Sequence, residues 1–294
     1  MKLFDEQYQG ITRNILNKGV LRQNRTGVDT WAIPAATLSV DLADGFPLLT
    51  LRRVPFKSMA VELEGFIGGI TDKRWYQERG CTIWDEWCNP TMVPYGHDEE
   101  TKAKMKAEPD LGPIYGYQWR RFCQHPYSMN STRLTPVEQP CDQLAAIVRS
   151  LTENPNNRRM VCSAWNPLQF HQMALPPCHV EWQVLVIDGK LHLNWTQRSC
   201  DLMLGVPYNM ASYALLAELL ALGANLEPGT VTGFLGDTHI YENHYDGACE
   251  ILRRRPTPSP EIRVVMADFF GWDHERAEPI DYTPHEKIVF PIAV

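Results

Sequence analysis

The chain has 294 residues, of which 44% are hydrophobic, 21% charged and 10% aromatic, and its formal net charge is −7. This composition allows a large buried core. The acidic balance argues against a nucleic-acid-binding surface, so we expect no nucleic-acid partner. No run of about eighteen apolar residues is present, so we expect no contact with a membrane. The start MKLFDEQYQG lacks a signal-peptide pattern, which favours a cytoplasmic protein.

The cysteine pattern gives no indication of a metal centre. The eight cysteines form no CxxC pair, and paired cysteines are the usual sign of a structural zinc site. We therefore expect no metal and interpret most of these cysteines as reduced thiols that pack as small buried hydrophobes.

The first third of the chain predicts two helices around a β-rich segment. Apolar residues recur at helical spacing from Phe4 to Ile15, and Gly19 is a plausible stop. Residues 30–41 are β-rich, and residues 56–67 have the pattern of a helix.

The middle of the chain contains a polar stretch followed by further regular elements. Residues 88–110 are charged and punctuated by prolines, which is typical of a surface insertion. A helix is predicted at about 142–152 and a strand at about 160–165. The clearest local signal is the hairpin EWQVLVIDGKLHLNWTQ, in which the Asp188-Gly189 pair suits a type I′ turn.

Strands and helices alternate along the chain without a boundary. The second arm of the hairpin alternates Leu191, Leu193 and Trp195, which implies one buried face. The stretch ASYALLAELLALGANLEPG is apolar nearly all round, which predicts a central helix. We therefore expect one α/β (α+β) domain over residues 1–294, with the surface insertion at 88–110.

Cys178 is the most promising candidate for chemistry. It lies in LPPCHVEW, after two prolines that restrict the backbone and before a β-rich run. The ordinary interpretation of a lone cysteine is a buried structural thiol, but nearby arginines could lower its pKa. The neighbouring His179 is a poor base for it, because adjacent residues of a strand point to opposite faces.

Four arginines lie in short contexts that suggest anion binding. A single arginine is usually a solvated or ion-paired surface residue. Convergence of several would make a phosphate clamp, because guanidinium groups match phosphate oxygens. The four are Arg25 in QNRTG, Arg158 and Arg159 in NPNNRRMV, and Arg198 in TQRSCD.

These segments together resemble the thymidylate synthase family, which includes pyrimidine-nucleotide hydroxymethylases. TIWDEW, DLGPIYGYQWR, NRRMVCSAWN, LPPCH, TQRSCD, GVPYNMASYALL and GDTHIYENH occur in the family's order. The resemblance extends from QNRTG to the final YTPHEKIVFPIAV. It implies a large mixed β-sheet flanked by helices, with the sheets of two subunits packed together in a homodimer.

The resemblance implies covalent chemistry on a uracil nucleotide. Cys178 would add to C6 of the pyrimidine, which activates C5 toward the one-carbon unit of 5,10-methylenetetrahydrofolate. Arg198 would bind phosphate beside the thiol, and Arg25 would complete this site. Arg158 and Arg159 resemble the pair that such enzymes donate across a dimer interface.

Further residues are placed around the nucleotide by the same resemblance. Asn209, in GVPYN, matches the amide that recognises uracil, which implies dUMP as substrate. His239 and Tyr241 would contact the sugar hydroxyl. Gln197 and Ser199, in TQRSCD, are expected on the substrate side of the site.

The remaining matched residues are expected to move protons or bind folate. Glu62 and Tyr115 would organise proton transfer, and Asp201 would bind the pterin; His179 is grouped with the catalytic residues despite its poor position as a base. Taken singly, Glu62 could be an exposed helix carboxylate, and the tryptophans could be core aromatics. The residues expected on the folate side are Trp84, Trp87, Asp201, Leu204, Gly205, Tyr208, Arg53 and Ala293.

One departure from the family pattern concerns the fate of the transferred carbon. Methylating members usually have Glu-Leu-Leu-Trp-Phe where this chain has Glu62-Leu63-Glu64-Gly65-Phe66. Gly65 lies on the helix face of Glu62 and is expected to leave room for water, whereas Glu64 is about 200° away round the helix. The acidic residue at position 64 resembles the residue that a phage hydroxymethylase has there.

We therefore favour a dUMP hydroxymethylase, in which water captures the methylene group on C5 and yields 5-hydroxymethyl-dUMP. The alternative is a thymidylate synthase, in which tetrahydrofolate donates a hydride and the products are dTMP and dihydrofolate. A remote third possibility is an inactive protein that only binds nucleotide or folate. The synthase-like FPIAV and TIWDEW segments support the second interpretation.

Overall fold

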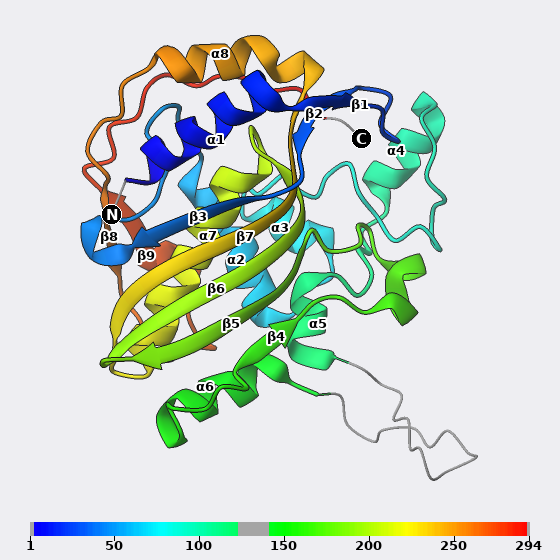
Figure 1. The fold of residues 1–294 in the computed structure, drawn as a ribbon. Coiled ribbons are helices and arrows are strands. Elements are labelled where there is room, and N and C mark those ends of the chain that lie inside the picture. Colours follow the sequence, from blue (N-terminus) through cyan, green and yellow to red (C-terminus); the bar gives the residue numbers. More distant parts are fainter. Residues whose placement is uncertain (1–2, 123–140, 293–294) are drawn as a thin grey trace.

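The computed structural model describes residues 3–122 and 141–292 (Figure 1). Helices occur along the whole described chain, and the long ones match the predicted helices near the N-terminus, at 56–67 and at 142–152. The α-helices are α1 (Phe4–Lys18), α2 (Phe56–Gly68), α3 (Lys73–Glu78), α4 (Glu99–Ala107), α5 (Tyr115–Arg121), α6 (Gln143–Glu153), α7 (Gly205–Gly223) and α8 (Tyr245–Arg253).

The strands include the predicted β-rich segments and the predicted hairpin. The last two form a small separate sheet. The strands are β1 (Val20–Arg22), β2 (Thr30–Ile33), β3 (Ala36–Asp41), β4 (Val161–Ser163), β5 (His179–Ile187), β6 (Lys190–Asp201), β7 (Glu227–Tyr241), β8 (Glu261–Val264) and β9 (Ala277–Ile280).

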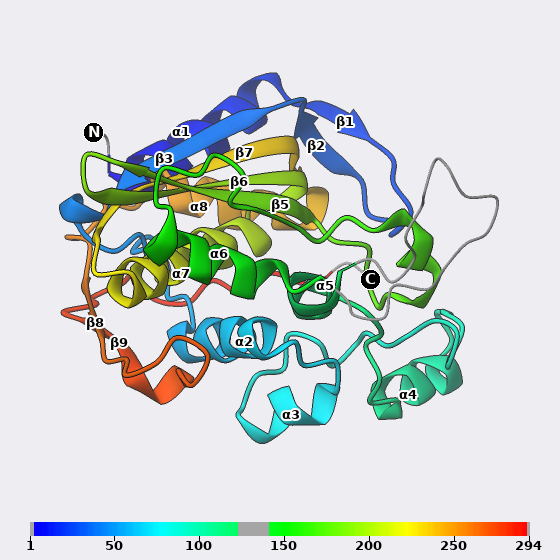
Figure 2. The same cartoon turned by 90° about the horizontal axis from the view of Figure 1, so that it is seen from below.

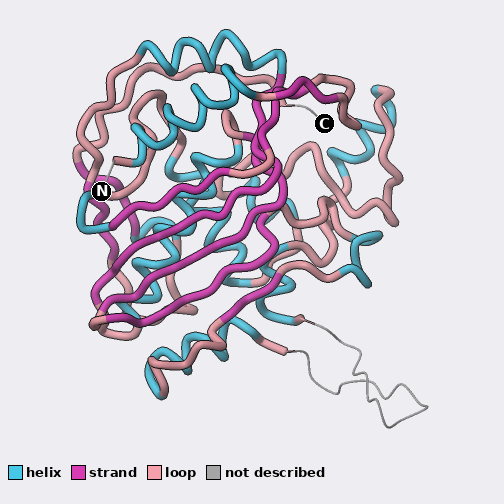
Figure 3. Tube along the Cα trace, in the orientation of Figure 1, coloured by secondary structure: helices cyan, strands magenta, loops and turns pink. Residues whose placement is uncertain are grey.

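The large sheet has seven strands in the order β1-β2-β7-β6-β5-β4, and β3 also pairs with β7. β6 and β7 run parallel, whereas the other pairs are antiparallel. Figure 3 shows these strands as one continuous twisted layer. This confirms the expected mixed α/β fold with a large mixed sheet flanked by helices.

Helices cover one face of the sheet. α7 contacts β6 and β7 and is also in contact with α2 on its other side. Figure 2 shows the sheet as one layer, with α7, α6 and α2 beneath it. α7 is buried on nearly every side, which confirms the predicted central helix. No element of the described residues covers the middle of the opposite face (Figure 1).

The predicted hairpin is confirmed by its backbone geometry. Asp188 has φ 52° and Gly189 has φ 73°, and a type I′ turn requires positive φ at both of these positions. Leu191, Leu193 and Trp195 are at most 1% exposed. The alternation therefore directs one face of β6 into the core, against α7.

The stretch at 88–110, for which the sequence predicted a surface insertion and no helix, contains helix α4. Asp98 caps this helix by accepting a hydrogen bond from the Thr101 N–H, as is usual at a helix N-terminus. Met105 is its one buried residue. Over residues 3–122 and 141–292, no helix has both the length and the apolar character needed to span a membrane.

The turn makes a prediction about stability. Gly189→Ala should lower the free energy of unfolding by about 1 kcal/mol, because alanine resists positive φ. Gly10→Ala, inside α1, should instead raise it by roughly 0.5–1 kcal/mol. A methyl group at either position would have no atom within 4 Å. The two variants therefore differ in the effect of backbone conformation on stability and not in side-chain contacts. Urea unfolding measures both, and equal effects would contradict the turn assignment.

Candidate active site

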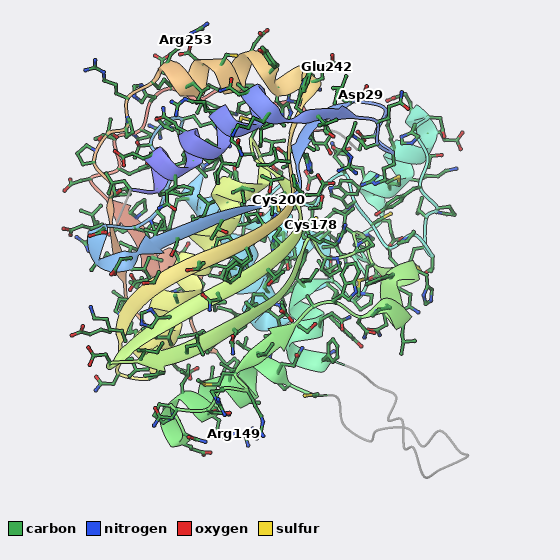
Figure 4. The ribbon with its side chains drawn as sticks, viewed as in Figure 1. Asp29, Arg149, Cys178, Cys200, Glu242 and Arg253 are labelled. Carbon is green, nitrogen blue, oxygen red and sulfur yellow. The ribbon has the colours of Figure 1, made fainter. Side chains whose placement is uncertain are left out.

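The candidate nucleophile, Cys178, directly precedes β5, where two prolines lead into the strand. Its backbone N–H donates to the Tyr115 hydroxyl at 2.8 Å. Its carbonyl accepts from the backbone N–H of Arg198 at 2.8 Å. The segment is therefore held from α5 on one side and from β6 on the other. Figure 4 shows Cys178 at one end of the long strands of the sheet.

The side chain of Arg198 binds the same segment a second time. Its Nε donates to the Pro177 carbonyl and its Nη2 to the Pro176 carbonyl, both at 2.9 Å. The guanidinium carbon lies 5.3 Å from the ring centre of Trp165, a cation–π arrangement that the sequence analysis did not identify. Because a guanidinium has five N–H donors, Arg198 can still bind an anion beside Cys178.

Opposing effects act on the Cys178 thiol. Burial raises its pKa above the usual 9.0, and the Arg198 charge, the Tyr115 hydroxyl and the Arg25 charge lower it in decreasing order. The net pKa is raised because burial has the largest effect. The two arginines thus limit the cost of forming a thiolate, which is the nucleophilic form.

His179 follows Cys178 but has an apolar environment. Its ring lies 4.7 Å from the ring of Tyr115 and 5.6 Å from that of Tyr213. Burial lowers the pKa of His179 from 6.5 to about 3, so the imidazole stays neutral at ordinary pH. These contacts fit a packing role for His179 rather than that of a base for Cys178.

Glu62 lies on α2 and is only 7% exposed, so the interpretation of an exposed carboxylate is wrong. Burial raises its pKa from 4.5 to about 7, and the Trp84 indole partly offsets this effect. The Trp84 N–H is itself buried and makes no hydrogen bond of regular geometry, so its influence on the Glu62 pKa is electrostatic. Glu62 can therefore exchange a proton near neutral pH.

Asn209, on α7, is 8% exposed and is oriented by Gln197. The Gln197 amide nitrogen donates to Asn209 Oδ1 at 3.0 Å and to the Ser199 carbonyl at 3.1 Å. The Gln197 amide oxygen accepts from the Trp195 indole at 3.2 Å. Gln197 itself is 2% exposed. It therefore holds the Asn209 amide, whereas Asn209 retains donors and a carbonyl lone pair for a ligand.

Asp201 ends β6 and begins the turn into α7. Its Oδ1 accepts from the backbone N–H groups of Met203 and Leu204 at 3.0 and 3.1 Å. This turn brings Leu204, Gly205 and Tyr208, all half-buried, to the start of α7. Burial has the largest effect in raising the pKa of Cys178, and the charge of Asp201 raises it further.

The residues expected near the sugar and phosphate come from two strands, β6 and β7, and a turn. His239 and Tyr241 lie at the end of β7 with ring centres 5.4 Å apart. Ser199 lies across from Asp237 in the β6–β7 pairing. Arg25 is exposed in the turn between β1 and β2. Burial raises the pKa of both Cys178 and Tyr241, and the charge of Arg25 opposes this effect at each.

The candidate folate side is aromatic and mostly buried. Trp84 is 4% exposed and its ring lies 6.1 Å from that of Tyr115. Trp87 is 8% exposed, so burial alone would also fit two core aromatics. Arg53 is exposed just before α2. Ala293 lies outside the described residues.

Arg158 and Arg159 do not join this cluster within one chain. Both are exposed before β4, and the Arg158 carbonyl accepts from the Gln183 amide at 3.2 Å. Gln183 lies five residues beyond Cys178 on β5, a span of roughly 16 Å at the rise of a strand. Of the four arginines, Arg198 and Arg25 are the two whose charges lower the pKa of the thiol against the larger effect of burial.

The expectation that Gly65 leaves room for water is wrong. A methyl group on Gly65 would lie 2.3 Å from Cε1 of Tyr76, so the tyrosine ring occupies this space. Tyr76 is fully buried, and its hydroxyl donates to the Ile70 carbonyl at 3.1 Å. Glu64 points elsewhere, as predicted, because its Oε2 accepts from Nδ1 of His274 at 2.7 Å.

Sequence reasoning also missed a histidine behind Asp201. His244 is 1% exposed, and its Nε2 lies 2.7 Å from the Pro291 carbonyl. Its Nδ1 lies 3.9 Å from Asp201 Oδ1. His244 thus lies between the C-terminal segment and the carboxylate expected to bind the pterin. Its place in the motif GDTHIYENH could have identified it from the sequence.

The described residues contain no candidate metal site. Among the described residues, no three His, Cys, Asp or Glu side chains come together in a way that could hold a metal ion.

Two comparisons with known proteins both relate this chain to thymidylate synthases. A family model described as thymidylate synthase matches residues 6–294. The chain is also 39% identical over 297 aligned positions to a bifunctional dihydrofolate reductase-thymidylate synthase of Paramecium tetraurelia. That alignment covers 99% of this chain and 61% of the relative, so the chain spans about three fifths of the relative's length.

The raised pKa of Glu62 predicts a pH-dependent effect on stability. Because the folded pKa of about 7 exceeds the usual 4.5, the contribution of Glu62 is full below pH 4.5 and is lost as pH rises through 7. Glu62→Gln removes this titration. Relative to wild type, the variant should gain about 3 kcal/mol of unfolding free energy between pH 4.5 and pH 8.

Urea unfolding at the two pH values measures this difference. The exposed Glu261 provides the control, since Glu261→Gln should change wild-type stability little at either pH. The same pH response in both variants would show that Glu62 does not carry a raised pKa.

Proposed function

The chain belongs to the thymidylate synthase family, and on that premise we propose that it transfers a one-carbon unit from 5,10-methylenetetrahydrofolate to C5 of dUMP. The observation that carries this proposal is the environment of Cys178. The half-buried thiol is influenced by the charge of Arg198 and by the Tyr115 hydroxyl, which also accepts a hydrogen bond from the Cys178 backbone N–H. This environment suits a nucleophile that attacks an anionic ligand.

The proposed reaction begins with addition of the Cys178 sulfur to C6 of the uracil ring. The C5–C6 double bond opens, and electron density moves to C5 and to the O4 oxygen. C5 then attacks the methylene carbon of the folate iminium ion, and the electron pair of its C=N bond moves to N5. A base removes the C5 proton, and the bond between the methylene carbon and N5 breaks, so that tetrahydrofolate leaves a methylene group double-bonded to C5. After hydride or water adds to this group, the Cys178 sulfur leaves C6 and the C5–C6 double bond forms again. Glu62 and Tyr115 would relay these protons, which the pKa of Glu62 near 7 supports.

The preference for uracil follows from Asn209. Its amide can donate to O4 and accept from N3–H of uracil, whereas cytosine presents the opposite polarity. Gln197 already binds Asn209 Oδ1 and limits rotation of the amide. Phosphate would be bound by Arg198 and Arg25, the sugar by His239 and Tyr241, and the pterin by Asp201 beside Trp84 and Trp87.

The fate of the methylene group on C5 depends on access of water. In one outcome tetrahydrofolate donates a hydride, which gives dTMP and dihydrofolate. In the other, water adds, which gives 5-hydroxymethyl-dUMP and leaves tetrahydrofolate unoxidised. The sequence favoured water because of Gly65. The Tyr76 ring fills that space, so we now propose hydride transfer, with hydroxymethylation as the second candidate.

We also propose that the active form is a homodimer in which the uncovered face of the sheet is the interface. Arg158 and Arg159 lie far from the thiol of their own chain and are exposed at the β4 edge of the sheet. A second subunit packed on this face would let these arginines complete its phosphate site.

We further propose that residues 1–294 form one catalytic domain with an insertion at 88–110, and that the protein acts in the cytoplasm without nucleic-acid partners.

An inactive protein that only binds nucleotide or folate would have to lack a reacting residue, yet Cys178, Glu62 and Tyr115 are all present. Cys178→Ala should abolish turnover while dUMP still binds.

Product analysis tests the chemical outcome. With dUMP and methylenetetrahydrofolate, we expect dTMP and dihydrofolate to form in equal amounts, measured by chromatography and by dihydrofolate absorbance. The main product 5-hydroxymethyl-dUMP without dihydrofolate would establish the second candidate. No product of either kind from the folded protein would instead support the inactive binding protein.

Tyr76→Ala provides the matched variant for this test. Removing the ring would open space beside Gly65 and near Glu62, whose charge influences Tyr76. A polar cavity of this size can hold water, so the variant should release a measurable fraction of 5-hydroxymethyl-dUMP. A product mixture unchanged from wild type would show that this space does not control water capture.

Subunit mixing tests the shared site. Cys178→Ser and the double variant Arg158→Ala/Arg159→Ala should each have little activity alone. After unfolding and refolding together, about a quarter of wild-type activity should return, because half of the dimers carry one complete site. The control is Arg253→Ala, exposed on α8, which should be active unaided. No recovery in mixed dimers would contradict donation across the interface.

A further inference from the structure

Lys73, the first residue of α3, has an unusual environment for a lysine. The residue is only 1% exposed, and its ammonium donates to three backbone carbonyls. The acceptors are those of Asp85 at 3.1 Å, Trp87 at 3.0 Å and Met105 at 2.9 Å. An ammonium has three N–H donors, so all of them are used on main-chain oxygens.

These three carbonyls belong to two different parts of the chain. Asp85 and Trp87 lie in the turn that carries the tryptophans of the candidate folate side, and Met105 lies on α4 within the insertion. The backbone N–H of Lys73 also donates to the Pro109 carbonyl at 2.8 Å. Lys73 therefore connects the tryptophan turn to both the helix and the end of the insertion.

A side chain with fewer than three donors could not satisfy all three carbonyls. Burial lowers the pKa of Lys73, which shows that placing the ammonium here has an energetic cost. Three buried carbonyls point at one location, and without the ammonium each would lose a charge-assisted hydrogen bond. The turn would then be free to separate from α4, because the carbonyls of Asp85 and Trp87 would no longer be held beside Met105.

The insertion is attached to the site at a second place. The Tyr95 hydroxyl donates to the Ala174 carbonyl, in the segment that leads to Cys178. The Tyr95 ring lies 6.1 Å from that of Trp87. Burial raises the pKa of Tyr95, and the charge of Arg25 opposes this effect. The insertion thus touches the tryptophan turn and the cysteine segment and lies within the field of the candidate phosphate site.

We propose that Lys73 is a positioning residue for folate binding, and that the 88–110 insertion acts through it as a brace that holds Trp84 and Trp87 in place. This inference rests on the proposed function, because it assigns those tryptophans to the folate site. Lys73 would touch neither substrate. Its effect would be confined to the folate half of the reaction.

Kinetics of Lys73→Met test this inference, since methionine keeps most of the side-chain volume and removes the donors. We expect the KM for methylenetetrahydrofolate to rise at least about tenfold, the size of effect that loss of charged hydrogen bonds gives. The Kd of dUMP, titrated without folate, should change less than about twofold, because Cys178 and Arg198 are anchored independently of the turn.

Lys106→Met is the matched control. Lys106 also joins α4 to the tryptophan turn, through Glu86 at 3.4 Å, but its side chain is 59% exposed. Exposed ion pairs contribute little, so this variant should keep the wild-type KM for folate. A general loss of stability in Lys73→Met would lower the fraction of active enzyme without raising KM, which thermal unfolding and active-site titration separate.

If Lys73→Met does not fold, Lys73→Gln retains two of the donors and should show a smaller rise in KM. An unchanged KM for folate in a folded Lys73 variant, with wild-type enzyme turning over normally, would overturn the inference. So would an equal rise for Lys106→Met. Failure of the wild-type enzyme to turn over dUMP with methylenetetrahydrofolate would instead count against the proposed function.

Discussion

The chemistry of this protein depends on how the segment from Pro176 to Cys178 is held. Arg198 binds it through its backbone N–H and through its guanidinium, and Tyr115 accepts a hydrogen bond from the Cys178 N–H. The antiparallel pairing of β5 with β6 brings Arg198 beside the cysteine. The helices that cover this sheet include α5, which brings Tyr115 to the cysteine. The thiol is therefore placed by the sheet and by the helical layer together.

The same burial that places these groups also sets their proton affinities. It raises the pKa of Cys178, which opposes thiolate formation, and it raises the pKa of Glu62 to about 7, which suits proton exchange. The charges of Arg198 and Arg25 partly offset the first effect, whereas at Glu62 the offset comes from the uncharged Trp84 indole. One apolar environment thus makes the nucleophile dependent on nearby cations and makes the carboxyl group a proton donor and acceptor.

Gly65 shows how a substitution can mislead when it is considered alone. A glycine in place of a large residue implies a void in an otherwise packed core. Here the ring of Tyr76 on the next helix fills the space, because interiors pack densely and a neighbour can supply the missing volume. Nothing in the sequence KRWYQE connects Tyr76 to Gly65. The expected path for water therefore disappears, although the residue change is real.

The sequence by itself determined the elements whose signals are local. These include the Asp188-Gly189 turn with its positive φ angles, the buried alternation along β6, the apolar helix α7, and the motifs that gather around Cys178. Tertiary structure decided what depends on contacts between distant residues: the burial of Glu62, the hold of Gln197 on Asn209, and the separation of Arg158 and Arg159 from the thiol. Periodicity and turn geometry act over a few residues and can be recognised in one segment. Burial, proton affinity and filled space arise only when segments far apart in the chain pack against each other.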